Sequence, residues 1–133
     1  MRSMTALLAA TFLLAAPHAQ AAPRGDGEAR LARALEGRVA GEPVDCIPLS
    51  HIRSSQVIDD TAILYDVGSV VYVNRPEAGR ESLNQWDALV VRPFGPRLCS
   101  IDSVRVYDTS ARMVTGIVFL GEFVPYRRVR DER

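Results

Sequence analysis

The stretch that decides the fold runs over residues 61–74 and reads Thr61-Ala62-Ile63-Leu64-Tyr65-Asp66-Val67-Gly68-Ser69-Val70-Val71-Tyr72-Val73-Asn74. β-Branched and aromatic residues are typical of strands, and a Val-Gly-Ser turn separates two such runs. The stretch therefore predicts a β-hairpin. Both runs are apolar on both faces, which predicts a central place in a sheet or barrel.

The hairpin lies between the only two cysteines of the chain, Cys46 and Cys99. In an oxidising compartment such a pair persists as a disulfide. The bond closes a loop of roughly 50 residues, for which the chain-entropy model gives about 4 kcal/mol of stabilisation. That is comparable to the whole stability of a small domain. The alternative is a reactive thiol, with Cys99 or Cys46 paired with His51 and the imidazole oriented by Asp102.

The N-terminus has the pattern of a secretory signal peptide over residues 1–21. Arg2 supplies the positive start, residues 7–16 form an apolar run too short to span a bilayer, and Ala19-Gln20-Ala21 fits a cleavage site. A retained N-terminal anchor helix is the alternative. We expect a periplasmic or secreted protein with no transmembrane anchor after cleavage, and a single domain of roughly 110 residues.

Short strand-like segments and turns surround the hairpin. Residues 22–43 predict a flexible leader with a short helix over 28–37, in which Leu31 and Leu35 share one face. Residues 44–126 predict a β-rich domain, and residues 127–133 a charged tail. The expected strands cover residues 61–66, 70–74, 88–92, 103–108 and 113–123, with a further strand within residues 51–58 and a short extended piece over residues 46–49. This pattern predicts a mainly β protein, a small antiparallel β-sandwich or barrel with one short N-terminal helix.

Four further residues carry specific expectations. Gly116 and Gly121 predict a bulge or bend in the strand over 113–123, and Pro125 is expected to end that strand. Trp86 is expected to fill one end of the core.

Several short motifs occur in a fixed order along residues 44–126: Cys46, Ile52-Arg53, Val57-Ile58-Asp59-Asp60, Leu64-Tyr65, Tyr72-Val73-Asn74, Leu98-Cys99-Ser100-Ile101-Asp102-Ser103-Val104 and Leu120-Gly121-Glu122-Phe123-Val124-Pro125. This order resembles a family of small secreted proteobacterial proteins of unknown function, a β-rich domain with paired cysteines. The resemblance implies export and a small β-rich fold. It implies no catalytic residue.

The sequence lacks the sets of residues that several common kinds of metal-binding, phosphate-binding and catalytic site require. After residue 21 the chain has one histidine, His51, and two cysteines, which do not supply the three or four ligands of a zinc site. No phosphate-binding glycine loop and no G-x-S-x-G motif occurs. Asp59-Asp60 predicts a turn rather than a carboxylate pair or a calcium loop. We therefore expect no catalytic residue, no metal and no cofactor.

The charge pattern gives little basis for a nucleic-acid partner, because 16 basic residues balance 16 acidic ones. Every basic residue is an arginine, which a GC-rich genome explains. Arginine recognition of phosphate or carboxylate needs clustering. The arginines cluster only in the tail, at Arg127, Arg128, Arg130 and Arg133.

Three hypotheses about function remain. The first is a non-catalytic binding or envelope-associated module whose partner is an envelope protein or peptide, held at an exposed sheet edge. A contiguous exposed apolar or aromatic patch would favour it. The second is a small-ligand carrier with a barrel cavity. The third is the thiol enzyme, which needs a free Cys99 close to His51. The first is preferred, with candidate binding residues His51, Arg53, Trp86, Arg105 and Tyr107.

Overall fold

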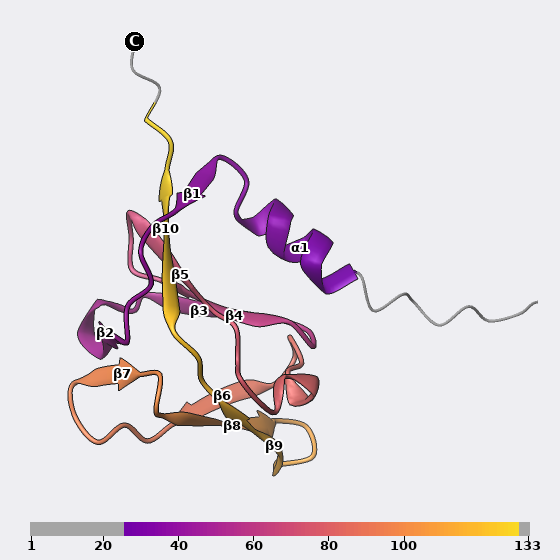
Figure 1. Ribbon diagram of the computed structural model, residues 1–133. Coiled ribbons are helices and arrows are strands. Elements are labelled where there is room, and N and C mark those ends of the chain that lie inside the picture. Colours follow the sequence, from indigo (N-terminus) through magenta and orange to yellow (C-terminus); the bar gives the residue numbers. More distant parts are fainter. Residues whose placement is uncertain (1–25, 131–133) are drawn as a thin grey trace, which may run out of the picture.

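A computed structural model describes residues 26–130, so the predicted signal peptide, residues 22–25 of the leader and residues 131–133 of the tail lie outside the described residues. The fold is mainly β, as predicted (Figure 1). The elements in chain order are α1 (Asp26–Ala34), β1 (Arg38–Ala40), β2 (Cys46–Pro48), the 3₁₀ turn η1 (Leu49–His51), β3 (Ser54–Ile58), β4 (Ala62–Asp66), β5 (Val70–Asn74), the 3₁₀ turn η2 (Arg80–Ser82), β6 (Ala88–Val91), β7 (Arg97–Cys99), β8 (Ser103–Asp108), β9 (Met113–Phe119) and β10 (Phe123–Arg128).

The strands form three antiparallel sheets. The five-stranded sheet has the order β1-β10-β5-β4-β3, the three-stranded sheet has the order β6-β8-β9, and β2 pairs with β7. Helix α1 lies on one side of the five-stranded sheet, and the two smaller sheets lie on the other (Figure 1). Because β1 and β3 are separate edges of the large sheet, it is open. This arrangement is a small sandwich rather than a closed barrel.

The hairpin of β4 and β5 is confirmed, and it occupies the interior of the five-stranded sheet. Ile63 and Tyr65 face the smaller sheets, whereas Ala62 and Leu64 face α1. Strands with a covered surface on each side need apolar residues at successive positions. That requirement explains why this stretch lacks a polar face.

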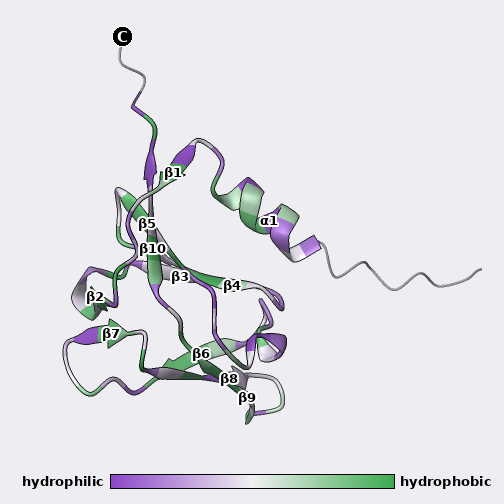
Figure 2. Cartoon of the chain, viewed as in Figure 1, coloured by the Kyte–Doolittle hydropathy of each residue, from purple (hydrophilic) through white to green (hydrophobic). Residues whose placement is uncertain are grey.

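Two hydrophobic cores result. The larger lies between the sheets and includes the fully buried Ile47, Leu98, Val106 and Phe123. The smaller lies under α1, where Leu31 is the buried helical residue. Figure 2 shows hydrophobic colour along β4, β5 and β6 and hydrophilic colour at the end of β10.

Helix α1 is shorter than the predicted span 28–37, because it ends at Ala34 and Gly37 adopts a φ of 72° before β1. Two ion pairs tie it down. Arg30 Nη1 lies 2.9 Å from Asp59 Oδ2, and Arg75 Nη1 lies 2.6 Å from Glu28 Oε1. A helix this short is marginal alone, so these contacts and the burial of Leu31 hold it in place.

The predicted disulfide is present between Cys46 and Cys99. The two residues are directly opposite on β2 and β7, with Cα atoms 4.0 Å apart. Their neighbours Ile47 and Leu98 are fully buried. The carboxylate of Asp102 accepts a hydrogen bond of 2.7 Å from the backbone N–H of Cys99, which fixes the turn after β7.

The predicted strand over 113–123 is wrong in its extent, because β9 ends at Phe119 and β10 begins at Phe123. Buried Asn74 holds this break. Asn74 Nδ2 donates to the carbonyl oxygen of Gly121 over 2.6 Å, and the N–H of Gly121 donates to Asn74 Oδ1 over 3.0 Å. Gly121 is needed because a Cβ there would lie 2.5 Å from the carbonyl oxygen of Arg75. The predicted bulge is confirmed, because pairing with β8 shifts register beside Gly116.

Pro125 does not end a strand, contrary to the prediction, but lies within β10 opposite Tyr72. Its carbonyl oxygen accepts a 2.7 Å hydrogen bond from the N–H of Gly41. The N–H and C=O groups of one strand residue point to the same side of the strand. Because the carbonyl of Pro125 points toward Gly41, its backbone nitrogen also points away from β5, and the missing N–H costs no hydrogen bond to β5. Strand β10 continues to Arg128 and pairs with β1, so paired structure extends beyond both limits of the predicted 44–126 domain.

Candidate functional site

The candidate binding residues from the sequence fall into separate places. His51 is exposed in η1, and Arg53 precedes β3, where its N–H donates to the carbonyl oxygen of Asp66 in β4. Arg105 and Tyr107 lie on β8 in the three-stranded sheet. Only these last two share one surface. Trp86 lies in the loop before β6 and is 79% exposed, so the prediction that it fills the core is wrong.

The surface that Arg105 and Tyr107 share is the outer face of the three-stranded sheet. Val104 and Val106 of β8 are fully buried, so the residues between and after them point outward. The other large outward residues follow from strand register and exposure: Val90 on β6, and Val114, Ile117 and Phe119 on β9. We call these six residues, Val90, Arg105, Tyr107, Val114, Ile117 and Phe119, the outer face.

The outer face is mostly apolar and open to solvent. Val114, Ile117 and Phe119 are 45%, 47% and 53% exposed. Register places Arg105 directly between Val90 of β6 and Ile117 of β9. None of the six residues is acidic. Five aliphatic or aromatic side chains around a single guanidinium form the kind of contiguous patch that marks an interaction surface.

The free edge of the sheet is less available than the sequence analysis expected. The N–H of Phe119 donates to the carbonyl oxygen of Ala78, and the N–H of Glu77 donates to the carbonyl oxygen of Phe119, both over 3.0 Å. Gly79, with a φ of 78°, packs against the carbonyl oxygen of Ile117. Residues 77–79 therefore cover this end of β9. A partner has access to the face of the sheet rather than to the edge at this end.

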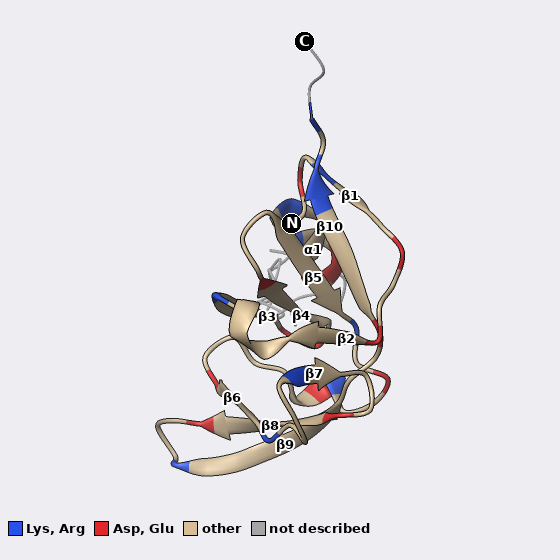
Figure 3. Cartoon of the chain, turned by 90° about the vertical axis from the view of Figure 1, so that its left-hand side faces the viewer, with Lys and Arg blue, Asp and Glu red and all other residues tan. Residues whose placement is uncertain are grey.

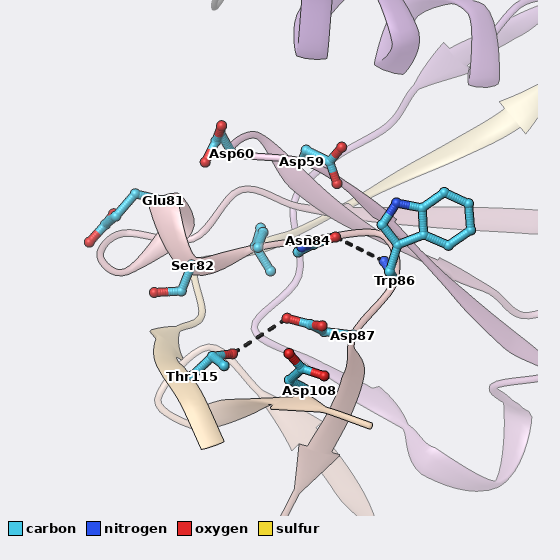
Figure 4. Close-up of a pocket in the computed structure, with 10 residues that line it drawn as sticks. Asp59, Asp60, Glu81, Ser82, Asn84, Trp86, Asp87, Asp108 and Thr115 are labelled. Atoms are coloured by element: carbon cyan, nitrogen blue, oxygen red, sulfur yellow. Dashed lines mark hydrogen bonds between the residues drawn. The ribbon is translucent and has the colours of Figure 1, made fainter. Parts of the chain in front are cut away.

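A second feature is an acidic concavity of about 620 Å³ between the β3–β4 turn and the three-stranded sheet (Figure 4). Trp86 lies at its border, where its backbone N–H donates to Asn84 Oδ1 over 3.0 Å. The carboxylates that line it come from five residues: Asp59, Asp60, Glu81, Asp87 and Asp108.

Three of these carboxylates have structural partners. Asp59 pairs with Arg30 and accepts a 2.6 Å hydrogen bond from the N–H of Gln85. Asp87 Oδ2 lies 3.4 Å from the hydroxyl of Thr115. Asp108 accepts hydrogen bonds from the hydroxyl and N–H of Ser110, which hold its pKa below the usual value. A carboxylate with a lowered pKa is a poor proton donor near neutral pH, so Asp108 does not fit a general acid.

The thiol-enzyme hypothesis loses its nucleophile, because both sulfur atoms are in the disulfide. The Asp102 carboxylate, which that hypothesis assigned to the imidazole of His51, instead accepts from the N–H of Cys99. Within residues 26–130, no three histidine, cysteine or acidic side chains are grouped so that they could hold a metal ion. The close approaches of Gly116 and Gly121 are to Ser82 and Arg75 of the chain itself rather than to a ligand cavity.

The apolar residues of the outer face were missed by the sequence analysis, although a signal for them was present. Residues 113–119 read Met-Val-Thr-Gly-Ile-Val-Phe, so neither face of this strand is consistently polar. The strand nevertheless lies at the edge of its sheet. The same lack of a polar face was correctly interpreted as burial for residues 61–74. For β9 it instead produces exposed apolar surface.

Comparison of the chain with protein-family models, curated proteins and solved structures finds no match. In the described part of the chain, no helix has the length and apolar character that crossing a membrane requires.

Proposed function

We propose that this protein is a non-catalytic binding module of the periplasm or the secreted fraction, and that an envelope protein or peptide docks on the outer face of its three-stranded sheet. The observation that carries the proposal is the exposure of Val114, Ile117 and Phe119 together on one side of β9. Soluble domains rarely leave a contiguous apolar sheet face uncovered.

The disulfide between Cys46 and Cys99 fits an oxidising compartment. The signal-peptide pattern of residues 1–21 supports export.

The chemistry of the outer face defines the partner. Arg105 is the one charged residue among the six of the outer face, and it lies between Val90 and Ile117. A complementary partner carries an apolar surface with one carboxylate set into it, because a guanidinium forms bidentate hydrogen bonds with a carboxylate. A two-fold contact between two copies of this chain that is centred on Arg105 would bring the two Arg105 side chains together, which disfavours self-association in that arrangement.

The test is affinity capture from an envelope extract with matched variants. Ile117→Ser combined with Phe119→Ser removes the apolar contact of the outer face, and both positions are already solvent-exposed, so the fold should persist. Val39→Ser is the control, because Val39 is an exposed aliphatic residue on β1, a strand of the five-stranded sheet.

We expect one envelope component to bind the wild type and the Val39→Ser variant, and to be lost from the double variant. Arg105→Glu should lose it as well, because the charge is reversed. Identical captured components for all four proteins would contradict the proposal.

A further inference from the structure

We propose that the end of β10 is an oxyanion site that binds a phosphate group through Arg127, Arg128, Arg130 and Ser69. These four residues line a concavity of about 430 Å³ beside the β4–β5 turn. The site lies on the five-stranded sheet, so it is independent of the outer face and of its proposed partner.

Strand pairing brings these residues together. Arg127 is opposite Val70, the residue that follows Ser69. The N–H of Val67 donates to the carbonyl oxygen of Val70 over 3.0 Å, which closes the turn and fixes Ser69 at its tip. The arginines thus start from a hydrogen-bonded strand rather than from a loose tail. Figure 3 shows blue, the colour of the arginine residues, at this end of β10, beside β1.

The positive charge at this site is uncompensated within the described residues. The ion pairs of residues 26–130 involve Arg30 and Arg75, and neither belongs to the site. Among residues 26–130, no acidic residue lines the concavity. Arg128 also pairs directly with Arg38 of β1, and like charges directly opposite each other destabilise a sheet. A bound anion would relieve this repulsion.

The number and type of donors favour phosphate over a carboxylate. Three guanidinium groups offer several forked N–H donors, and the Ser69 hydroxyl adds another. A phosphate presents more acceptor oxygens and more charge than a carboxylate, which has two oxygens and one charge. Free phosphate and the phosphate of a lipid headgroup both satisfy this chemistry.

The first arm of the test is titration of the ¹⁵N-labelled protein with inorganic phosphate at constant ionic strength. We expect saturable shifts of the amide signals of Ser69, Val70, Arg127 and Arg128. Arg127→Gln combined with Arg128→Gln should weaken binding by at least about tenfold, because the variant loses the charge-assisted hydrogen bonds that both guanidinium groups donate to the phosphate. Unchanged amide signals in β3 and β8 establish that the variant is folded.

The matched control is Arg33→Gln combined with Arg92→Gln. Both of these arginines are exposed, and the control changes the net charge of the protein by the same amount. It should bind phosphate like the wild type. Equal weakening in the control would show a general charge effect and would overturn the proposed site, as would the absence of saturable shifts together with no binding in the vesicle arm.

The second arm distinguishes the sources of the phosphate. Cosedimentation with phosphatidylglycerol vesicles, compared with phosphatidylcholine vesicles, tests a lipid headgroup. Binding to phosphatidylglycerol that is lost in Arg127→Gln/Arg128→Gln and retained in the control assigns the site to a headgroup. Binding of inorganic phosphate without vesicle binding assigns it to a soluble phosphate. Vesicle binding that this double variant retains would overturn the proposal.

Discussion

Removal of the disulfide should cost much of the stability of the domain. Cys46 and Cys99 are 53 residues apart in sequence, and a loop of this length corresponds to about 4 kcal/mol in the chain-entropy model. For a domain of roughly 100 residues, this loss lowers the melting temperature by roughly 15–30 °C. The bond joins directly opposite positions of β2 and β7, so its loss should leave the rest of the fold recognisable.

The assay is thermal unfolding of the wild type with and without reductant, together with Cys46→Ser, Cys99→Ser and the double variant. Each single variant should lose nearly as much stability as the double variant, because each already removes the bond. Thiol labelling of the native protein should give no signal until reductant is added. Native thiols that react freely would contradict the disulfide itself, and reduction that leaves the melting temperature unchanged would contradict its stabilising role.

Three further predictions follow from buried or paired polar groups. The hydroxyl of Tyr65 has no hydrogen-bond partner in the described residues, and burial raises its pKa. Tyr65→Phe should therefore stabilise the protein by about 1 kcal/mol, measured by denaturant titration. A clear loss of stability would instead reveal a hydrogen-bond partner of this hydroxyl. Asn74→Ala should destabilise it by about 2–4 kcal/mol, because both backbone groups of Gly121 would lose their buried partners; a cost below 1 kcal/mol would contradict this role. The hydrogen bond from Arg75 lowers the pKa of Glu28, so the stabilisation from this pair is complete above the usual glutamate pKa of 4.5 and is lost as the pH falls through the lowered value. Because the pair is exposed, Glu28→Gln should cost less than about 1 kcal/mol at neutral pH and nothing in strong acid; an equal cost at both pH values would exclude the ion pair as the cause.

Local signals in the sequence predicted much of the fold. The hairpin over 61–74 combined strand-forming residues with a short turn, so its position and its central place were both correct. The disulfide followed from the cysteine count and the expected compartment. These features depend on neighbouring residues or on composition alone.

Long-range contacts explain what the sequence analysis missed. The break between β9 and β10 is held by Asn74, which lies 47 residues before Gly121. The pairing of β1 with β10 likewise joins residues far apart in the chain, and it makes Arg127 and Arg128, the first two residues of the predicted tail, part of a strand. No local pattern reports either contact.

The candidate site was predictable only in part. Arg105 and Tyr107 were among the predicted binding residues and lie within the predicted strand over 103–108, but their sequence neighbours do not reveal that β9 pairs beside them and extends their surface. The exposure of Trp86 depends on the turn made by Asn84, whereas a lone tryptophan ordinarily indicates burial. The function of the exposed apolar residues therefore becomes arguable only once the sheet is assembled.

The most direct test of the central claim is site-specific photocrosslinking in the cells that produce the protein. A photoreactive residue at position 117 places the reactive group on the outer face, and the same residue at position 39 serves as the control. We expect a discrete crosslinked product with an envelope protein or peptide from position 117 and none from position 39. The absence of a crosslink at 117, or the same products from both positions, would contradict the claim that the outer face is the binding surface.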